Sequence, residues 1–380
     1  MERTGAPWVR GRGLERLLAQ ETNVSDLIQF LSDRDPAPWE PLVGFVPDDL
    51  VREVSAANNA DLLLTAGSKS AVIEVKLGHL MSAQQQDKYE ALDPDLDLYL
   101  AALGADEVRL SEVSDRWKFL SLSSLFSGWE SSQDELARSL AREAATLLKE
   151  WDRIISGVLE TGAAEGGLQL DELKQKFLAR VVTRRLVKEL HSRGYMAVAG
   201  VTSGGGLPII KAWAPIRGEG EDRTFIAEVR WRDNKPGGEL RFGVDFDPRP
   251  GHKEDEEVRR AAYDLAHSME HDIDHQALHV RLTEDRSDLG EALSRGKSSR
   301  PTARGDWEAV IVHGLKGAPM KDGGRNTRRR TTPAFYGDGA LRFQAISDID
   351  FSRVSAQDLV DLIDLTLNHL SSTEPEQSMS

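Results

Sequence analysis

The sequence predicts an α/β protein with two domains, of which the first combines helices with short strands and the second is α+β with an antiparallel sheet. Three observations support this expectation. The chain has 380 residues, more than a single hydrophobic core usually organises. Apolar residues at helical spacing alternate with short apolar runs along the chain. The segment Thr161–Gly167 contains three glycines in seven residues and is the best candidate for a boundary.

The composition excludes several classes of protein. Hydrophobic residues make up 39% of the chain and charged residues 29%, which is typical of a soluble globular protein. No run approaches the ~18–20 apolar residues that a membrane span requires, so we expect no membrane partner. The N-terminus lacks the apolar region of a signal peptide, which predicts a cytoplasmic location. The absence of cysteine excludes disulfides and zinc–thiolate sites, so any metal must be held by oxygen or imidazole.

The net charge of −15 argues against a protein that coats nucleic acid without specificity, because such binding depends on cations that neutralise phosphates. One segment departs from this balance. Residues 316–330 combine several glycines with a high density of basic side chains. We predict that this segment contacts nucleic-acid phosphates, and the alternative is an exposed loop without a function. The basic residues are Lys316, Lys321, Arg325, Arg328, Arg329 and Arg330.

The first element is a helix whose apolar face carries a carboxylate. Steps of three and four residues predict the helix, and they join Leu14, Leu17, Leu18, Val24, Ile28 and Leu31. Glu21 falls on the same face, where a carboxylate is costly unless something pairs with it. Two interpretations remain open at this point. Either Glu21 has a functional partner, or the helix breaks near Asn23 and leaves Glu21 solvated.

Three short β-like runs follow, and the links between them are short enough to predict an antiparallel meander. The runs are Leu50–Ser55, Ala60–Thr65 and Ala71–Leu77. Ser82 then begins a helix, because Gln85 three residues later completes an S-x-x-Q capping box. This helix should end near Leu92, and two further strands are predicted at Leu96–Leu103 and Trp117–Leu122.

The remaining elements define the domains. A long helix capped by Ser131 or Ser132 should bridge the domains over residues 131–160. The second domain, residues 168–370, begins with a helix at Asp171–His191 and continues into a four-stranded meander. The meander strands are Tyr195–Val201, Ile209–Ile216, Thr224–Arg232 and Glu239–Phe246. A helix from Glu254, three strands, a helix at Ser355–Leu370 and a disordered tail at 371–380 complete the prediction. These last strands are Ala277–Leu282, Trp307–Gly314 and Leu341–Phe351.

The chemistry is concentrated on two of the early strands. Asp61 lies near the start of one strand, and Glu74 lies within the next, so antiparallel pairing can place them side by side. Glu74 and Lys76 are two residues apart and share a face of the sheet. Two carboxylates and a backbone carbonyl, such as that of Val75, suit Mg²⁺ or Mn²⁺. A lysine beside such an ion can position a water for attack on a phosphodiester.

These motifs resemble the PD-(D/E)XK nuclease superfamily. The resemblance is carried by Asn59-Ala60-Asp61 and Glu74-Val75-Lys76 on strands between two helices, with Ala60 in place of the proline of the name. It implies that Asp61 and Glu74 bind a divalent metal and that Lys76 assists the attacking water. Glu21 fits the acidic residue that many members place on the helix before the sheet, where it can reach the metal through water. Gln85 and Tyr89 resemble the Q-x-x-x-Y signature of the RecB-like branch.

The resemblance covers residues 14–125 and implies a restriction-endonuclease-like core within residues 1–130. The implied function is a magnesium- or manganese-dependent nuclease that hydrolyses DNA, in antiviral defence or in repair. The rival hypothesis is a catalytically inactive nuclease-fold protein that binds nucleic acid or a protein partner. The second domain indicates no chemistry by itself, and a homo-oligomer or a protein partner through this domain stays open.

A second candidate metal site comes from four histidines at four-residue intervals, His267, His271, His275 and His279. On a continuous helix the four imidazoles would lie on one face, and two histidines four residues apart can bind zinc or nickel. The alternative is a solvated helix end, because the strand predicted at Ala277–Leu282 would break the alignment.

Overall fold

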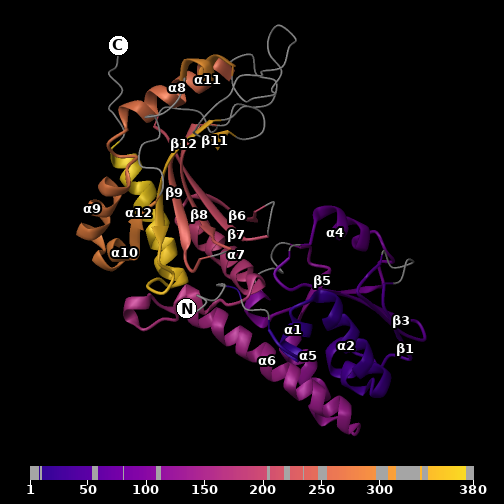
Figure 1. Cartoon of the computed structure of the whole chain (residues 1–380). Coiled ribbons are helices and arrows are strands. Elements are labelled where there is room, and N and C mark those ends of the chain that lie inside the picture. The colour runs from indigo at the N-terminus through magenta and orange to yellow at the C-terminus, as the bar shows by residue number, and fades with distance from the viewer. Residues whose placement is uncertain are drawn as a thin grey trace. The chain divides into compact units, whose positions relative to one another are not determined.

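The structure is a computed structural model that describes residues 8, 11–53, 59–79, 81–107, 113–202, 206–217, 223–233, 235–246, 255–296, 307–313, 334–335 and 341–373. It has the expected mixed α/β class (Figure 1). The contacts divide the chain into two compact units. The N-terminal unit consists of Trp8–Gly157 together with Leu173–Arg185, and the C-terminal unit includes Val158–Glu172 and the chain from Leu186 onward. No helix in the ranges described is long and apolar enough to cross a membrane.

The N-terminal unit is built on a mixed sheet in the strand order β1-β2-β3-β4-β5. The strands are β1 (Asp49–Val51), β2 (Leu62–Ala66), β3 (Lys69–Val75), β4 (Asp97–Ala102) and β5 (Trp117–Ser121). Strands β1, β2 and β3 form the predicted antiparallel meander, which is thereby confirmed. Strands β4 and β5 continue the sheet in parallel pairing. Helix α4 (Ala83–Glu90) lies between β3 and β4 in the chain, as a parallel connection requires.

Helices precede and follow this sheet in the chain. They are α1 (Leu14–Leu18), α2 (Glu21–Arg34), α3 (Glu40–Val43), α5 (Leu122–Gly128) and α6 (Glu135–Glu160). The start of α2 and the N-cap of α6 differ from the prediction. The predicted first helix is therefore two helices, with the break just before Glu21. The predicted cap of the long helix at Ser131 or Ser132 is wrong. Asp134 accepts a hydrogen bond from the Ala137 amide at 2.8 Å, because a carboxylate satisfies the open N–H groups of a first turn.

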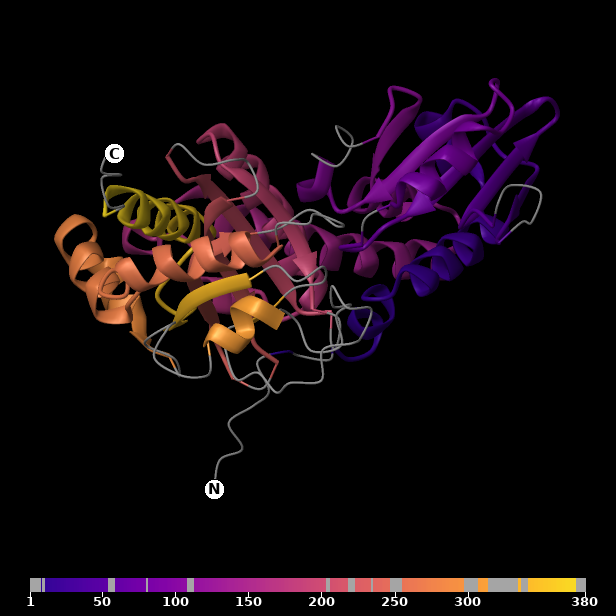
Figure 2. The ribbon, with the colours of Figure 1, turned by 90° about the horizontal axis from the view of Figure 1, so that it is seen from above.

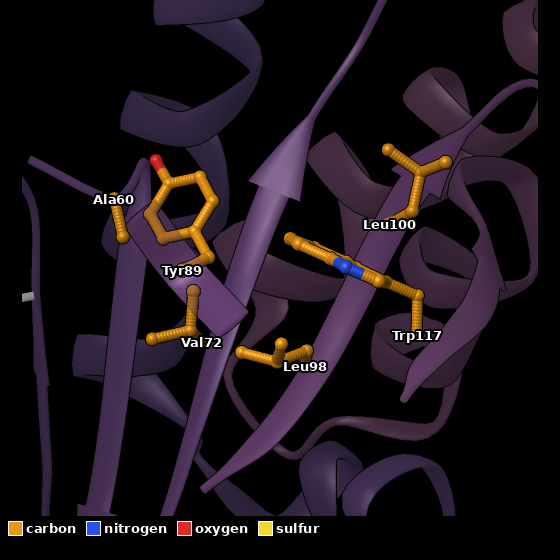
Figure 3. Packing of buried hydrophobic residues seen from close by; sticks show 6 residues of the cluster. All are labelled: Ala60, Val72, Tyr89, Leu98, Leu100 and Trp117. Carbon is orange, nitrogen blue, oxygen red and sulfur yellow. The ribbon is translucent and has the colours of Figure 1, made fainter. Parts of the chain in front are cut away.

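The core of the N-terminal unit places α4 against the sheet. One face of the sheet and the ring of Tyr89 form a buried apolar cluster, shown in Figure 3, of Ala60, Val72, Tyr89, Leu98, Leu100 and Trp117. The rings of Tyr89 and Trp117 pack edge to face with 5.7 Å between their centroids. Helix α2 packs against β1 and β3. These contacts fix α4 and α2 relative to the end of β3.

Helix α7 (Lys176–Ser192) contributes its first half to the N-terminal unit, although the sequence analysis assigned residues 168–370 to the second domain. The side chain that ties it there is Arg184, which is 8% exposed. Its guanidinium donates to the carbonyl of Gly78 at 2.8 Å and to the carboxylate of Asp106 at 2.6 Å. Helix α7 is thereby attached to the loops that follow β3 and β4.

The C-terminal unit is built on an antiparallel sheet in the order β10-β12-β9-β8-β7-β6, with β11 also paired to β12. The strands are β6 (Met196–Val201), β7 (Pro208–Pro215), β8 (Arg223–Trp231), β9 (Gly238–Phe246), β10 (Leu293–Arg295), β11 (Ala334–Phe335) and β12 (Leu341–Ile349). The predicted antiparallel meander from β6 to β9 is confirmed. Its helices are α8 (Asp255–Ser268), α9 (His275–Asp285), α10 (Ser287–Ala292), α11 (Trp307–His313) and α12 (Ala356–Ser372). Figure 2 shows α8 and α12 alongside this sheet.

Two of the predicted strands in this unit are helices. The segment Ala277–Leu282 lies within α9, and residues 307–313 of the predicted strand Trp307–Gly314 form α11, while Gly314 lies outside the described residues. In both helices the buried apolar residues are four apart, Leu278 with Leu282 and Trp307 with Ile311. A short apolar run does not distinguish a strand from a helix, and the helical spacing prevailed. Asp274 also caps α9 by accepting from the Gln276 amide at 2.7 Å.

The attachment of α7 generates a stability prediction. Arg184→Ala leaves the Asp106 carboxylate buried without its cation, so the free energy of unfolding should fall by about 3–5 kcal/mol. The double variant Arg184→Met/Asp106→Leu should recover most of this loss, because it removes both charges and keeps the volume. Urea denaturation followed by tryptophan fluorescence measures both effects. A single variant as stable as the wild type would show that the pair is solvated.

Candidate active site

Glu74 is the next-to-last residue of β3 and Lys76 directly follows this strand, whose residues from Ala71 to Val75 are all buried. Glu74 is 2% exposed and Lys76 is 8% exposed. The ammonium of Lys76 donates to Oε1 of Glu74, as the shared sheet face predicts. A carboxylate removed from water in this way must be matched by donors within the protein. The other donors come from α4.

Helix α4 brings Gln85 and Tyr89 to the Glu74 carboxylate. The Ser82 hydroxyl caps the helix by accepting from the Gln85 amide at 3.1 Å. One turn apart on the helix, Gln85 Nε2 donates to Oε1 of Glu74 at 2.6 Å and the Tyr89 hydroxyl donates to Oε2 at 2.7 Å. Figure 3 shows the Tyr89 ring between Ala60 and Trp117, so this residue belongs both to the core and to the site. Burial and the charge of Glu74 raise the pKa of Tyr89 and keep its hydroxyl protonated as a donor.

Asp61 directly precedes β2, where the pairing of Leu62 with Ile73 places it opposite Glu74. Its Oδ2 accepts a hydrogen bond from the Val75 amide at 2.8 Å. Asn59, two residues earlier, has a positive φ of 61°, an unusual backbone conformation for a residue other than glycine. Burial, followed by the charge of Glu74, raises the pKa of Asp61 to about 6. The site therefore holds two carboxylates close enough to repel each other.

Glu21 is the first residue of α2, and its carboxylate turns toward the sheet. Oε1 of Glu21 accepts from the Leu77 amide at 2.6 Å, and its charge also contributes to the raised pKa of Asp61. The helix continues through Asn23, so the break predicted there is wrong, and a functional role of Glu21 stays a prediction. The break lies instead at Ala19–Gln20, and Glu21 is not left to solvent. Its partner is the backbone at the end of β3.

Three successive amides at this strand end each have an acceptor. The Val75 amide donates to Asp61, the Lys76 amide donates to the Ala101 carbonyl at 2.9 Å, and the Leu77 amide donates to Glu21. The backbone on which Glu74 and Lys76 are placed is therefore held from both sides and by β4. The Val75 carbonyl lies in the same segment, and its role as a metal ligand stays a prediction.

The donor set can be tested for its fit to a divalent ion. All candidate ligands are oxygens, the ligands that Mg²⁺ and Mn²⁺ prefer. Oε2 of Glu74 accepts one hydrogen bond and keeps one acceptor position, whereas Oε1 accepts two. Within the described residues, no three histidine, aspartate or glutamate side chains are spaced to hold an ion as they stand. Magnesium usually keeps several waters and binds only one or two carboxylates, so Asp61 and Glu74 fit this mode.

Two other sequence predictions have different outcomes. The basic residues between Lys316 and Arg330 lie outside the described residues, so their contact with phosphates stays a prediction. The four histidines do not share one helix. His267 belongs to α8, His275 and His279 belong to α9, and His271 lies between these helices. His275 instead makes a 2.8 Å hydrogen bond with the Ser347 hydroxyl, as a core histidine does.

Arg180 is a charged side chain near the site that the sequence analysis did not single out. It lies one turn before Arg184 on α7, and its guanidinium is 2.9 Å from Nε2 of His79, two residues after Leu77. Burial lowers the pKa of Arg180, and the negative charge of Glu21 opposes this effect by raising it. The only signal in the sequence is the spacing of Arg180 and Arg184, which share a helix face. No sequence pattern around Arg180 predicts that this helix face lies near β3.

The crowding of carboxylates generates a prediction for the metal-free protein. The folded protein keeps Asp61 protonated up to about pH 6, whereas the unfolded chain releases this proton near pH 4. Stability should therefore fall as the pH rises from about 4 to about 6 and stay lower above this range. Asp61→Asn removes the charge and keeps an acceptor for the Val75 amide. In a chelating buffer at pH 8 it should stabilise the fold by about 2–3 kcal/mol and at pH 4 by much less.

Thermal melting at both pH values measures this difference. The matched control is Asp87→Asn, which removes an exposed carboxylate on α4 and should leave the melting temperature unchanged at both pH values. A lower melting temperature of Asp61→Asn at pH 8 would contradict the prediction, because it would mean that the Asp61 charge stabilises the metal-free fold.

No protein-family model, no curated protein and no solved structure matches this chain at a significant level. What supports a function is therefore the chemistry and the geometry of the chain's own residues.

Proposed function

We propose that the chain is a metal-dependent nuclease that hydrolyses phosphodiester bonds in nucleic acid, with DNA as the expected substrate. One observation supports this most strongly. Six polar side chains from four segments of the chain meet at the end of β3, and they are Glu21, Asp61, Glu74, Lys76, Gln85 and Tyr89. The order of α2, the β1–β3 meander, α4 and β4 also agrees with the resemblance to PD-(D/E)XK nucleases.

In this proposal Asp61 and Glu74 hold Mg²⁺ or Mn²⁺, with the Val75 carbonyl as a further ligand and Glu21 acting through water. The ion would polarise the phosphate and lower the pKa of a bound water. The chain supplies the position of these oxygens. The Val75 and Leu77 amides orient the carboxylates of Asp61 and Glu21, so that little reorganisation is needed when substrate arrives.

Lys76 acts on the attacking water. Its ammonium is held at the Glu74 carboxylate, so it can donate a hydrogen bond to a water beside the metal ligands and stabilise the negative charge that develops. The water oxygen forms a bond to phosphorus while the bond to the leaving ester oxygen breaks. The water loses one proton and the leaving oxygen gains one, so the products are an alcohol and a phosphomonoester.

Gln85 and Tyr89 are positioning residues in this proposal. Both donate to Glu74 and set the direction in which its free acceptor position points. Because the Tyr89 ring is packed in the core, the hydroxyl can move little. A small displacement of a ligand can lower turnover considerably.

The second candidate function is binding of nucleic acid or a protein partner without catalysis. The observation that favours it is the saturation of Oε1 of Glu74 by two donors of the protein itself, since a purely structural network would have this form. One simple assay distinguishes the two functions. A catalytic site binds a divalent ion and cuts plasmid DNA, and a non-catalytic site of this kind does neither.

The wider setting of this function is also part of the proposal. The basic segment with Arg328, Arg329 and Arg330 would contact phosphates, and a role in defence against foreign DNA or in repair would follow from a cytoplasmic DNA nuclease. The C-terminal unit would bind a protein partner or a second copy of the chain.

The first test separates the metal ligands from the residue that acts on water. Asp61→Asn should weaken Mg²⁺ binding and abolish cleavage, because the amide keeps the shape but loses the anionic ligand. Lys76→Ala should leave metal affinity intact or improved, because it removes a positive charge and one of the two donors to Oε1 of Glu74, while turnover falls by ~10²-fold or more. Calorimetric titration with Mg²⁺ and a plasmid-cleavage time course measure both effects. The control is Lys118→Ala, which removes an exposed lysine of β5.

Equal cleavage by the wild type and Lys76→Ala would place the chemistry outside this motif. Wild-type protein that neither binds a divalent ion nor cuts any nucleic acid would favour the non-catalytic function instead.

The second test concerns α4. Tyr89→Phe keeps the ring in contact with Trp117 and removes the donor to Oε2 of Glu74, so turnover should fall by about 10-fold or more while the melting temperature changes little. Gln85→Ala should behave in the same way. Tyr89→Ala, in contrast, should lower the free energy of unfolding by about 3–5 kcal/mol, because it opens a cavity. Normal turnover of Tyr89→Phe would make Tyr89 a residue of the core alone.

A further inference from the structure

The first half of α7 packs against the loop that directly follows the end of β3. Gly78, which follows the strand end, has a φ of 76°, and a Cβ atom there would lie 2.8 Å from the carbonyl oxygen of Phe177 on α7. Only glycine allows this approach. Together with the bond from Arg184 to the Gly78 carbonyl at 2.8 Å, it fixes the loop of residues 77–79 against the helix.

The same loop separates a carboxylate of the site from a cation of α7. On one side, the Leu77 amide donates to Glu21 at 2.6 Å. On the other side, the Arg180 guanidinium is 2.9 Å from Nε2 of His79. A guanidinium has no acceptor, so it donates and the imidazole nitrogen accepts. His79 is exposed and Arg180 is half-buried, so the guanidinium is partly accessible to solvent.

Arg180 and Arg184 share a helix face but differ in their surroundings. Arg184 is 8% exposed and holds two fixed partners of the fold, which makes it a structural residue. Arg180 is more accessible and lies within the field of Glu21, and burial lowers its pKa while the Glu21 charge raises it. A guanidinium stays charged under all ordinary conditions, so Arg180 is a permanent cation at the edge of the carboxylate cluster.

The site carries more negative than positive charge, so a further cation would favour the binding of an anionic substrate. With all groups ionised, the carboxylates of Glu21, Asp61 and Glu74 outnumber the single ammonium of Lys76. An anionic substrate would be repelled by this balance, and one divalent ion only neutralises it. A planar guanidinium with five donors is the side chain best suited to grip a phosphate at this edge.

We propose that Arg180 of α7 binds a substrate phosphate next to the scissile bond, so that the first half of α7 is part of the substrate-binding surface. This inference rests on the proposed nuclease function. The binding is direct, through one charge-assisted contact between the guanidinium and non-bridging phosphate oxygens. His79 orients Arg180 and is not itself the phosphate contact.

The test uses the full chain and a short fluorescein-labelled DNA duplex in Ca²⁺, which occupies oxygen sites and supports little hydrolysis in a magnesium nuclease. Arg180→Ala should raise the Kd of this duplex by about 10- to 100-fold, the range expected for a charge-assisted contact. The slope of log affinity against log salt should decrease by about one phosphate contact. Arg180→Lys keeps the charge and should keep the slope, with a smaller rise in Kd because the bidentate geometry is lost.

Two further measurements separate this role from a structural one. Calorimetric Mn²⁺ titration should show unchanged or improved metal affinity in Arg180→Ala, and in Mg²⁺ its KM should rise more than its kcat falls. Arg153→Ala, at an exposed arginine of α6, should match the wild type in every readout. His79→Ala should keep the salt slope. If Arg180→Ala fails to fold, Arg180→Lys and Arg180→Gln carry the comparison.

Three results would overturn the proposal. A wild type that binds and cleaves the duplex beside an Arg180→Ala variant with the same Kd and salt slope would remove Arg180 from the substrate surface and leave the nuclease function intact. A His79→Ala variant that reproduces the whole loss of slope would place the phosphate contact elsewhere. A wild type that neither binds nor cuts DNA would overturn the nuclease function itself, and the role of Arg180 with it.

Discussion

The burial of the Glu74 carboxylate at the end of an apolar strand is the constraint on which the rest of the N-terminal unit depends. A charge with 2% exposure destabilises a fold by several kcal/mol unless it is matched. Three donors match it, and they are Lys76, which directly follows the same strand, and two side chains of α4. The position of α4 is in turn set by Tyr89, whose ring packs into the core while its hydroxyl reaches Glu74. Tyr89 therefore contributes both to the packing of the core and to the hydrogen bonds of the candidate site.

The second constraint is repulsion among like charges. Asp61 lies opposite Glu74 and has a pKa raised to about 6, so the metal-free cluster is less stable than a neutral one of the same shape. A fold keeps such a cluster only where the surrounding contacts outweigh it, and here the amides of Val75 and Leu77 hold two of the carboxylates in place. Concentrated carboxylates with this support are the environment in which a bound cation gains most.

The two units use charge in different ways. In the N-terminal unit buried charges lie at the end of β3 and in the Arg184–Asp106 pair. In the C-terminal unit they cross one face of the sheet, where Arg342 pairs with Glu228 at 2.9 Å and with Asp245 at 2.9 Å. The fully buried Glu228 also contacts Arg230, so this network is compensated within the sheet. Such compensation is typical of a structural network, and the face indicates no chemistry of its own.

Apart from Gln85 and Tyr89, which a resemblance singled out, the sequence by itself determined the local features: the antiparallel meanders, the helix capped by Ser82, and the placement of Asp61, Glu74 and Lys76 on neighbouring strands. These depend on side-chain alternation, helical spacing and capping, which act over a few residues. Only the tertiary structure decided what depends on distant segments. The parallel pairing of β4 and β5, the Leu77 amide as partner of Glu21, and the attachment of α7 through Arg184 join residues far apart in the chain. Short apolar runs such as Ala277–Leu282 were ambiguous for the same reason, because burial by neighbouring elements, and not the run itself, selected the helix.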